Sequence, residues 1–355
     1  MALDLCRNAA ANDLNLTFVS LGGGDLEQDF RNSGVEFIRL NRKLPIDLKL
    51  ASQLRRIIKA REINVVHGHQ PVDALHAYLA TRRSHVKRVL TLHGVYAGAK
   101  NNLALKFVLP RMHARVVLGK DLPDWLAQEQ GLDTNLSFEV INNGVDQARL
   151  QSQGRTLRTE LGLSGNAMLL GMIANFYADR RKDQLTVCKA LPQLFARAAA
   201  AHFVFVGSSA GAPHLFDECV TFCRQQNISD RVHFLGQRAD ISDVLSSLDL
   251  FVLSSRWEGS PIAVMEAMMM GIPTVLSDIG PLKEVSGDGR YAVLFRLGDA
   301  DELARKLIQL VDDRDCRARL SPSARRWAMS QFSIETHIAN LLKLYGSLVA
   351  TEAGP

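Results

Sequence analysis

Short runs of apolar and β-branched residues alternate along the whole chain with longer stretches of helical periodicity. Before residue 150 the runs are LTFVSL (16–21), VEFIRL (35–40), INVVHG (63–68), RVLTLHG (88–94), ARVVLG (114–119) and SFEVINNG (137–144). After it they are AMLLGMI (167–173), HFVFVG (202–207), RVHFLG (231–236), DLFVLS (249–254), IPTVLS (272–277) and YAVLF (291–295). Runs that are apolar on both faces are typical of parallel strands covered by helices. The pattern therefore predicts an α/β protein built from βαβ units.

The chain has 355 residues, which is more than a single compact core usually holds. A polar stretch over residues 145–165 separates the two sets of runs. We therefore expect two Rossmann-like, doubly wound domains, at residues 1–150 and 151–332. The first of them begins with a helical pattern over Met1–Ala11 and no strand ahead of it. Since a Rossmann sheet begins with a central strand and a glycine-rich turn, we hypothesise that this first strand is missing.

The charge is distributed unevenly. Between Arg31 and Trp125 there are 18 Lys and Arg and 6 Asp and Glu, a net of +12, whereas the whole chain carries +5 and the remainder therefore −7. A basic surface attracts nucleic acid, anionic lipid or a phosphorylated substrate. No RNA-binding signature with interleaved aromatic residues is visible, so we do not expect a nucleic-acid partner. Two alternatives stay open for KNNLALKFVLPRMHARVV (100–117): a helix on an anionic membrane surface, or a half-buried helix with solvated charges.

The composition also bears on the cellular compartment in which the protein is expected. No apolar run approaches the roughly 20 residues that cross a bilayer, and Asp4 and Arg7 interrupt the segment where a signal peptide would have its apolar core. The five cysteines have spacings that suit neither a disulfide framework nor a zinc site. We expect a cytoplasmic protein, with peripheral contact at the inner face of the plasma membrane as the open alternative.

The stretch SSRWEGSPIAVMEAMMMGIPTV (254–275) carries the strongest chemical signal. Glu258 and Glu266 are eight residues apart, on either side of a predicted helix start. Ser260 suits the N-cap, Pro261 the first helical position and Gly271 the end of the helix. The free amides of a first helical turn bind anions such as a diphosphate.

This stretch resembles the E-G-x-P-x₄-E-A-x₃-G-x-P-V pattern of glycosyltransferase family 4, the retaining GT-B enzymes. INNGVD (141–146) is similar to the end of that family's acceptor domain, and the final helix, about 333–349, is expected to pack back on that domain. The resemblance implies that Glu258 contacts the donor sugar and Glu266 the nucleotide ribose. The implied diphosphate and base contacts are the backbone of Gly259, Ser260, Pro261 and Ile262 (of which Pro261 has no N–H to donate), the glycine turn at Gly207 and the loop of VHFLGQR that ends at Arg238.

The family also places a basic pair after the first strand of its second domain. In IANFYADRRKDQ (173–184), Lys182 matches the family lysine. The usual arginine position falls near Asn175, and Arg180 or Arg181 is the expected substitute. Preorganised cations and helix amides stabilise charge on a departing diphosphate, so no metal and no other cofactor are expected.

Histidines follow two strands of the first half. His93 in LTLHGVY resembles the family histidine that lines the sugar site. His67 and His69 in VVHGHQP end another strand and are expected on the acceptor side. The resemblance therefore implies a retaining transferase that moves a sugar from a nucleotide diphosphate to the hydroxyl of a glycan or lipid-linked acceptor. The alternatives are a donor-binding pseudoenzyme or scaffold, a nucleotide-sugar epimerase of the same fold, and a hydrolase using the two glutamates.

Overall fold

A computed structural model describes the chain except residues 95–97, 133–134, 155 and 351–355. The chain forms two compact units. The first contains Met1–Gly144 and the segment that begins at Phe332, and the second contains Val145–Gln331. Each unit has its own parallel sheet or sheets and its own buried core.

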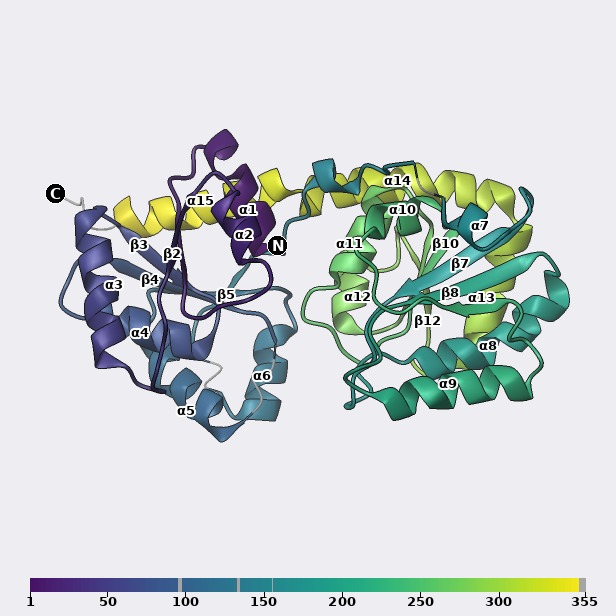
Figure 1. Cartoon of the computed structure of the whole chain (residues 1–355), viewed down its shortest axis with the longest axis horizontal. Coiled ribbons are helices and arrows are strands. Elements are labelled where there is room, and N and C mark those ends of the chain that lie inside the picture. Colours follow the sequence, from purple (N-terminus) through teal and green to yellow (C-terminus); the bar gives the residue numbers. More distant parts are fainter. Residues whose placement is uncertain (95–97, 133–134, 155, 351–355) are drawn as a thin grey trace. The chain divides into compact units, whose positions relative to one another are not determined.

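The second unit is built on one six-stranded parallel sheet of order β12-β11-β10-β7-β8-β9 (Figure 1). Its strands are β7 (Met168–Ile173), β8 (Ala201–Val206), β9 (Val232–Phe234), β10 (Leu250–Leu253), β11 (Thr274–Ser277) and β12 (Val293–Phe295). This is the strand order of a Rossmann fold, in which the chain builds outward from β7 to β9, then returns beside β7 and builds the other way. With right-handed crossovers, the helices that connect consecutive strands within each half cover opposite faces of the sheet.

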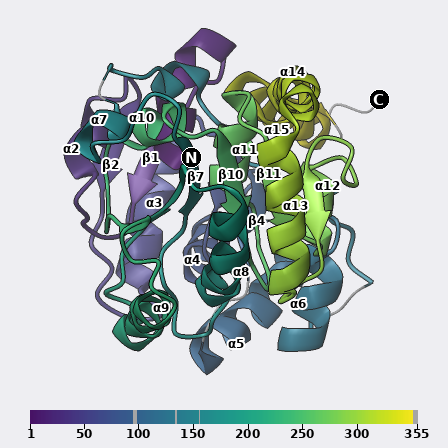
Figure 2. The ribbon, with the colours of Figure 1, turned by 90° about the vertical axis from the view of Figure 1, so that its right-hand side faces the viewer.

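The helices of the second unit follow this order. They are η3 (Gln147–Leu150), α7 (Leu157–Glu160), α8 (Gln184–Arg197), α9 (Pro213–Gln225), α10 (Ile241–Ser246), α11 (Ile262–Met269), α12 (Gly280–Val285), α13 (Ala300–Asp312) and α14 (Arg314–Phe332). Figure 2 shows α8 and α13 side by side, and α8 also packs against α9. The strands β7, β8 and β10 are almost entirely buried between the helices, as their apolar sequences predict.

The strands of the first unit form two parallel sheets. One pairs β1 (Thr17–Ser20) with β2 (Glu36–Arg39), and the other has the order β3-β4-β5-β6. The latter strands are β3 (Val65–Gly68), β4 (Lys87–Leu92), β5 (Ala114–Val117) and β6 (Glu139–Val140). Within the residues that the structure describes, no ladder joins the two sheets.

The helices of the first unit are α1 (Ala2–Asn8), η1 (Ala10–Asn12), α2 (Glu27–Arg31), α3 (Leu48–Ala60), α4 (Pro71–Thr81), α5 (Ala99–Val108), η2 (Leu109–Arg111), α6 (Leu122–Gln130) and α15 (Ile334–Ala350). The C-terminal helix α15 packs on this unit. Ile334, Ile338 and Leu341 join Val89 and Val116 in one buried cluster. The amphipathic face of α15 therefore completes the core beneath β4 and β5.

All the strands predicted from apolar runs are present, and the GT-B type of fold is confirmed by the Rossmann-like architecture and by the solved structures described below. The predicted run SFEVINNG shortens to the two residues of β6. Its end is held by α15 instead of by strand pairing, because His337 Nδ1 lies 2.7 Å from the carbonyl oxygen of Asn142.

Candidate active site

In the second unit, the strands β7 and β10 are neighbours whose following segments diverge to opposite faces of the sheet. Ligands of open α/β sheets bind at such a switch point, outside the carboxyl ends of the strands. Lys182 follows β7, and Glu258 follows β10. Backbone hydrogen bonds join the two segments, from Asp183 N to the Ser254 oxygen (2.9 Å) and from Arg256 N to the Arg181 oxygen (2.8 Å). The topology therefore brings Lys182 and Glu258 together.

The two side chains form an ion pair between Lys182 Nζ and Glu258 Oε1. The Lys182 side chain is 15% exposed and the Glu258 side chain 8%. Taking two charges out of water is costly, and the cost is met only when the partners hold each other closely. The pair therefore places a cation and a carboxylate at the edge of the sheet where ligands of open α/β sheets generally bind.

The start of α11 differs from the prediction. We expected Ser260 at the N-cap and Pro261 inside the helix, but the helix begins at Ile262 and Pro261 is the N-cap, with φ −82° and ψ 73°. This turn directs the Ile262 amide to the Ser260 carbonyl oxygen (3.0 Å) instead of to a ligand. Among the described residues, the amides of Gly259, Ser260 and Ala263 meet no acceptor, and the buried Ser260 hydroxyl has no partner. Unsatisfied donors thus remain at the helix start, one residue later than predicted.

Glu266, on the second turn of α11, is buried and pairs with Arg149. Arg149 belongs to η3, near the beginning of the second unit. From the sequence, this segment is expected only to connect the two domains. No local pattern predicts the pair, because its members are 117 residues apart.

The two arginines before Lys182 point in different directions. Arg181 donates to Asp179 and lies over the rings of Trp257 and Tyr177, at 4.4 and 4.7 Å from the ring centroids. Arg180 instead pairs with the exposed Glu218, at 2.9 Å. Of the two substitutes for the family arginine, Arg181 is thus the one that contacts the residue next to Glu258.

Asn175 and Gly207 lie in neighbouring turns after β7 and β8. The Asn175 Oδ1 accepts from the Ser208 amide (2.8 Å), so its side chain fixes the turn. Gly207 has φ +153°, and a Cβ there would lie 2.2 Å from the Ala174 carbonyl oxygen. Only glycine lets these two turns approach so closely.

Arg238 lies in a third loop and is bound by two carboxylates of its own unit. Its guanidinium donates to Glu160 and Asp240, and these hydrogen bonds raise its pKa. The charged head is therefore neutralised by its own unit.

The first unit brings three histidines together at the carboxyl ends of β3 and β4. His69 Nδ1 and His93 Nε2 are 3.0 Å apart, and the rings of His67 and His69 stack at 4.7 Å. His67 is held on both sides, by Tyr345 Oη from α15 (2.5 Å) and by Thr91 Oγ1 (2.7 Å). The sequence pattern indicates the histidines but not Tyr345, which is 278 residues away from His67.

These histidines are neutral. Burial, together with the neighbouring imidazole groups, lowers the pKa of His69 to about 3. Burial, the His337 ring and the N-terminal amine lower the pKa of His93 to about 4, and burial holds the pKa of His67 well below its usual range. Neutral imidazoles both donate and accept hydrogen bonds, which suits recognition of hydroxyl groups.

The basic segment of the first unit keeps an exposed apolar surface. In α5, Leu105 and Val108 are buried, whereas Leu103 is 72% and Phe107 41% exposed. Arg111 lies 3.9 Å from the centroid of the Phe107 ring. None of the described helices is long and apolar enough to cross a membrane.

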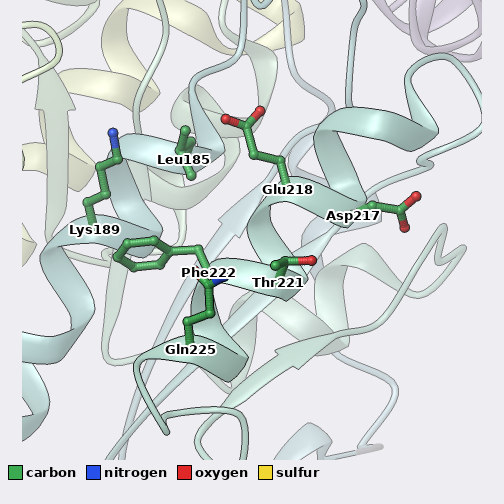
Figure 3. Close-up of a pocket in the computed structure, with 7 residues that line it drawn as sticks. All are labelled: Leu185, Lys189, Asp217, Glu218, Thr221, Phe222 and Gln225. Atoms are coloured by element: carbon green, nitrogen blue, oxygen red, sulfur yellow. The ribbon is translucent and has the colours of Figure 1, made fainter.

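A separate groove of about 370 Å³ lies between α8 and α9 (Figure 3). Lys189 comes from α8, and Glu218, Phe222 and Gln225 come from α9. It contains neither Glu258 nor Glu266, so we do not assign the site to it. In the described part of the chain, no group of three or more His, Cys, Asp or Glu is arranged to hold a metal ion.

Family models match both units of the chain. Residues 1–149 match the model of the family "Glycosyltransferase Family 4", and residues 167–313 match that of "Glycosyl transferases group 1". The chain belongs to glycosyltransferase family 4. It is therefore a retaining glycosyltransferase that uses nucleotide-sugar donors, and this confirms the resemblance read from Glu258–Val275.

Relatives of this glycosyltransferase span most of its length. It is 26% identical to N-acetyl-alpha-D-glucosaminyl L-malate synthase of Bacillus anthracis over 85% of this chain and 79% of that one. It is 24% identical to the UDP-Gal:alpha-D-GlcNAc-diphosphoundecaprenol alpha-1,3-galactosyltransferase of Escherichia coli, over 92% and 86%. The structure of Anabaena HepE in complex with UDP and glucose has the same fold, with a TM-score of 0.81 at 20% identity over 98% and 96% of the two chains.

Proposed function

We propose that this glycosyltransferase moves a hexose or hexosamine from a UDP-linked donor to a hydroxyl of a lipid-linked glycan. We assign the donor to the second unit and the acceptor to the first. The E. coli relative acts on a diphosphoundecaprenol acceptor, which supports a lipid-linked acceptor here. HepE binds UDP and glucose, which supports a UDP-linked donor. Retention is expected by front-face displacement, in which the departing diphosphate helps to deprotonate the acceptor.

The observation that carries the proposal is the Lys182–Glu258 pair beside the unsatisfied amides of Gly259, Ser260 and Ala263. In this proposal, Lys182 and the amides bind the diphosphate as charge grows on its leaving oxygen. Glu258, released from Lys182, accepts hydrogen bonds from the sugar hydroxyls. Arg181 adds a second cation, and Glu266 binds the ribose. Asn175 and Gly207 shape the backbone turns that face the nucleotide, and the loop ending at Arg238 faces the base.

On the acceptor side, we assign to His93 the contact with the sugar and with the nucleophilic hydroxyl. His69 and His67 line the acceptor side next to it. The distance of 3.0 Å between His69 and His93 and the bonds of His67 to Tyr345 and Thr91 support a preorganised set of rings. A lipid-linked acceptor requires access to a membrane surface. The exposed Leu103 and Phe107, with Lys100, Lys106 and Arg111 beside them in sequence, support peripheral contact with anionic lipid at the cytoplasmic face.

The donor assignment is tested by measuring UDP release from a set of UDP-hexoses and UDP-N-acetylhexosamines, with and without undecaprenyl-diphosphate-linked GlcNAc. We expect slow release without acceptor, stimulation by acceptor, and loss of both in Glu258→Gln. Asp312→Asn, which removes an exposed partner of Arg197 in the same unit, should keep full activity. Tight UDP-sugar binding without any turnover would instead support a scaffold. Conversion of the free sugar nucleotide would support an epimerase.

The membrane assignment is tested by cosedimentation with vesicles. We expect binding to vesicles containing anionic lipid at low salt, weaker binding at high salt, and a loss of binding when Leu103 and Phe107 are both replaced by Gln. Equal recovery with zwitterionic and anionic vesicles would contradict a role for the basic segment.

A further inference from the structure

Glu266 is a buried carboxylate whose cation comes from a distant segment. Its side chain is 7% exposed, and Oε1 accepts from Nη2 of Arg149, whose side chain is 33% exposed. A carboxylate removed from water stays ionised only beside a compensating charge or strong donors. Arg149 supplies such a charge to the carboxylate assigned to the ribose.

The segment that carries Arg149 is capped at its start and attached to the rest of the second unit at its end. Ahead of it, Asp146 Oδ1 accepts from the Ala148 amide (2.8 Å). Behind it, the buried Asp243 of α10 accepts from the Ser152 hydroxyl (2.6 Å) and the Gln153 amide (2.7 Å). Leu150, next to Arg149, is buried. The backbone of η3 is therefore anchored, and it presents Arg149 to Glu266 from a defined position.

We propose that Arg149 is a positioning residue for nucleotide recognition: it holds the Glu266 carboxylate ionised and oriented toward the ribose hydroxyls. This inference rests on the proposed ribose contact of Glu266. A carboxylate offers about four acceptor positions, so the bond from Arg149 to Oε1 does not by itself prevent two vicinal hydroxyls from donating to the group. The bound guanidinium restricts rotation of the carboxylate, which lowers the entropy lost when the ribose binds.

If Arg149 positions Glu266, the protein should distinguish a nucleotide with ribose from one with deoxyribose. A site built to hydrogen-bond a hydroxyl disfavours the analogue that lacks it, because the acceptor is then left unpaired. We therefore compare binding of UDP and 2′-deoxy-UDP by calorimetry, in the unchanged chain and in Arg149→Met, Arg149→Lys, Glu266→Gln and the double variant Arg149→Met with Glu266→Gln. The ratio of the two dissociation constants is measured within each protein, so a change in the folded fraction does not alter it.

We expect the unchanged chain to prefer UDP by about 10-fold or more, in line with a hydrogen bond to a charged group. Arg149→Met and Glu266→Gln should each bring the ratio close to 1, and the double variant should bring no further change, because both substitutions remove the same interaction. Arg149→Lys should restore part of the preference, since it keeps the charge without the planar geometry.

Arg158→Met is the matched control. Arg158 pairs with Asp249 and also donates to backbone carbonyls of the second unit, so its loss lowers stability without touching the Glu266 carboxylate. We expect an unchanged ratio in this control. If Arg149→Met kept the preference for UDP over 2′-deoxy-UDP while Glu266→Gln lost it, only the positioning role of Arg149 would be overturned. A normal ratio in Glu266→Gln, or failure of the unchanged chain to bind UDP, would overturn the proposed nucleotide contacts themselves.

Discussion

Both units collect polar side chains at the carboxyl ends of neighbouring parallel strands, but the electrostatics of the two collections differ. In the second unit, the carboxylates of Glu258 and Glu266 are buried against Lys182 and Arg149, so charge is retained in pairs. In the first unit, burial lowers the pKa of His69 and His93, so charge is removed. The same kind of sheet edge thus supports a charged site in one unit and a neutral one in the other.

The difference follows from what surrounds each group. In the second unit, each buried carboxylate lies beside a group of opposite charge, which compensates for its removal from water. Among the histidines, burial disfavours the charged form, and a proton on one ring repels a proton on the next. In the proposed function, the paired charges bind a diphosphate and the neutral rings bind hydroxyl groups.

The largest effect is expected when the Lys182–Glu258 pair is broken. Lys182→Met should lower kcat by about 10²- to 10³-fold, because a cation facing the leaving group is lost. It should also lower the free energy of unfolding by about 3–5 kcal/mol, since the Glu258 carboxylate remains buried without its partner. Steady-state kinetics and urea unfolding measure the two effects separately.

The double variant Lys182→Met with Glu258→Gln separates stability from catalysis. Removing both charges leaves no uncompensated ion, so most of the lost stability should return. Activity should stay as low as in the single variant or lower. Recovery of activity together with stability would mean that the pair serves only the fold.

The sequence predicts the strands and the helix that follows Glu258 because these depend on local patterns. Apolar runs specify buried strands, and the spacing from Glu258 to Glu266 places both residues around one helix start. What the sequence could not predict are contacts that only tertiary structure brings about, such as Arg149 with Glu266 and Tyr345 with His67. The predicted N-cap at Ser260 was wrong because Pro261 adopts a turn conformation that delays the helix by one residue.

In the first unit, His93→Asn should lower kcat for transfer by about 10-fold, the value of one lost hydrogen bond at the reacting hydroxyl. The dissociation constant of UDP should not change, because the proposed nucleotide contacts all belong to the second unit. Kinetics with saturating donor and calorimetry with UDP measure the two quantities. A weakened UDP affinity with normal kcat would reverse the assignment of His93.

The neutral histidines should also make stability sensitive to acid. An unfolded histidine has a pKa near 6.5, above the folded values of about 3 for His69 and about 4 for His93. Below about pH 6.5 the unfolded chain therefore binds more protons than the folded one, and the free energy of unfolding falls as pH decreases. Each histidine contributes a slope of about 1.4 kcal/mol per pH unit down to its folded pKa, and nothing above about pH 7. Urea unfolding between pH 7.5 and 5 measures this slope. The free energy of unfolding should fall less steeply with decreasing pH in the double variant His69→Asn with His93→Asn than in the unchanged chain. Equal slopes in the two proteins would contradict the neutral cluster.

The smallest effects distinguish the two neighbouring arginines of the second unit. Arg181 lies over Trp257, next to Glu258, so Arg181→Gln should weaken UDP binding by about fivefold, the scale of one partly exposed charge. Arg180 pairs with Glu218 at an exposed position, and Arg180→Gln should change UDP binding by less than about twofold. Calorimetry at two salt concentrations adds a check, because the deficit of Arg181→Gln should shrink as salt screens the cation in the unchanged chain. If Arg180→Gln instead weakened UDP binding more than Arg181→Gln, the 180–182 loop would have to rearrange when the nucleotide binds. The preorganised charge of the second unit would then not extend beyond Lys182.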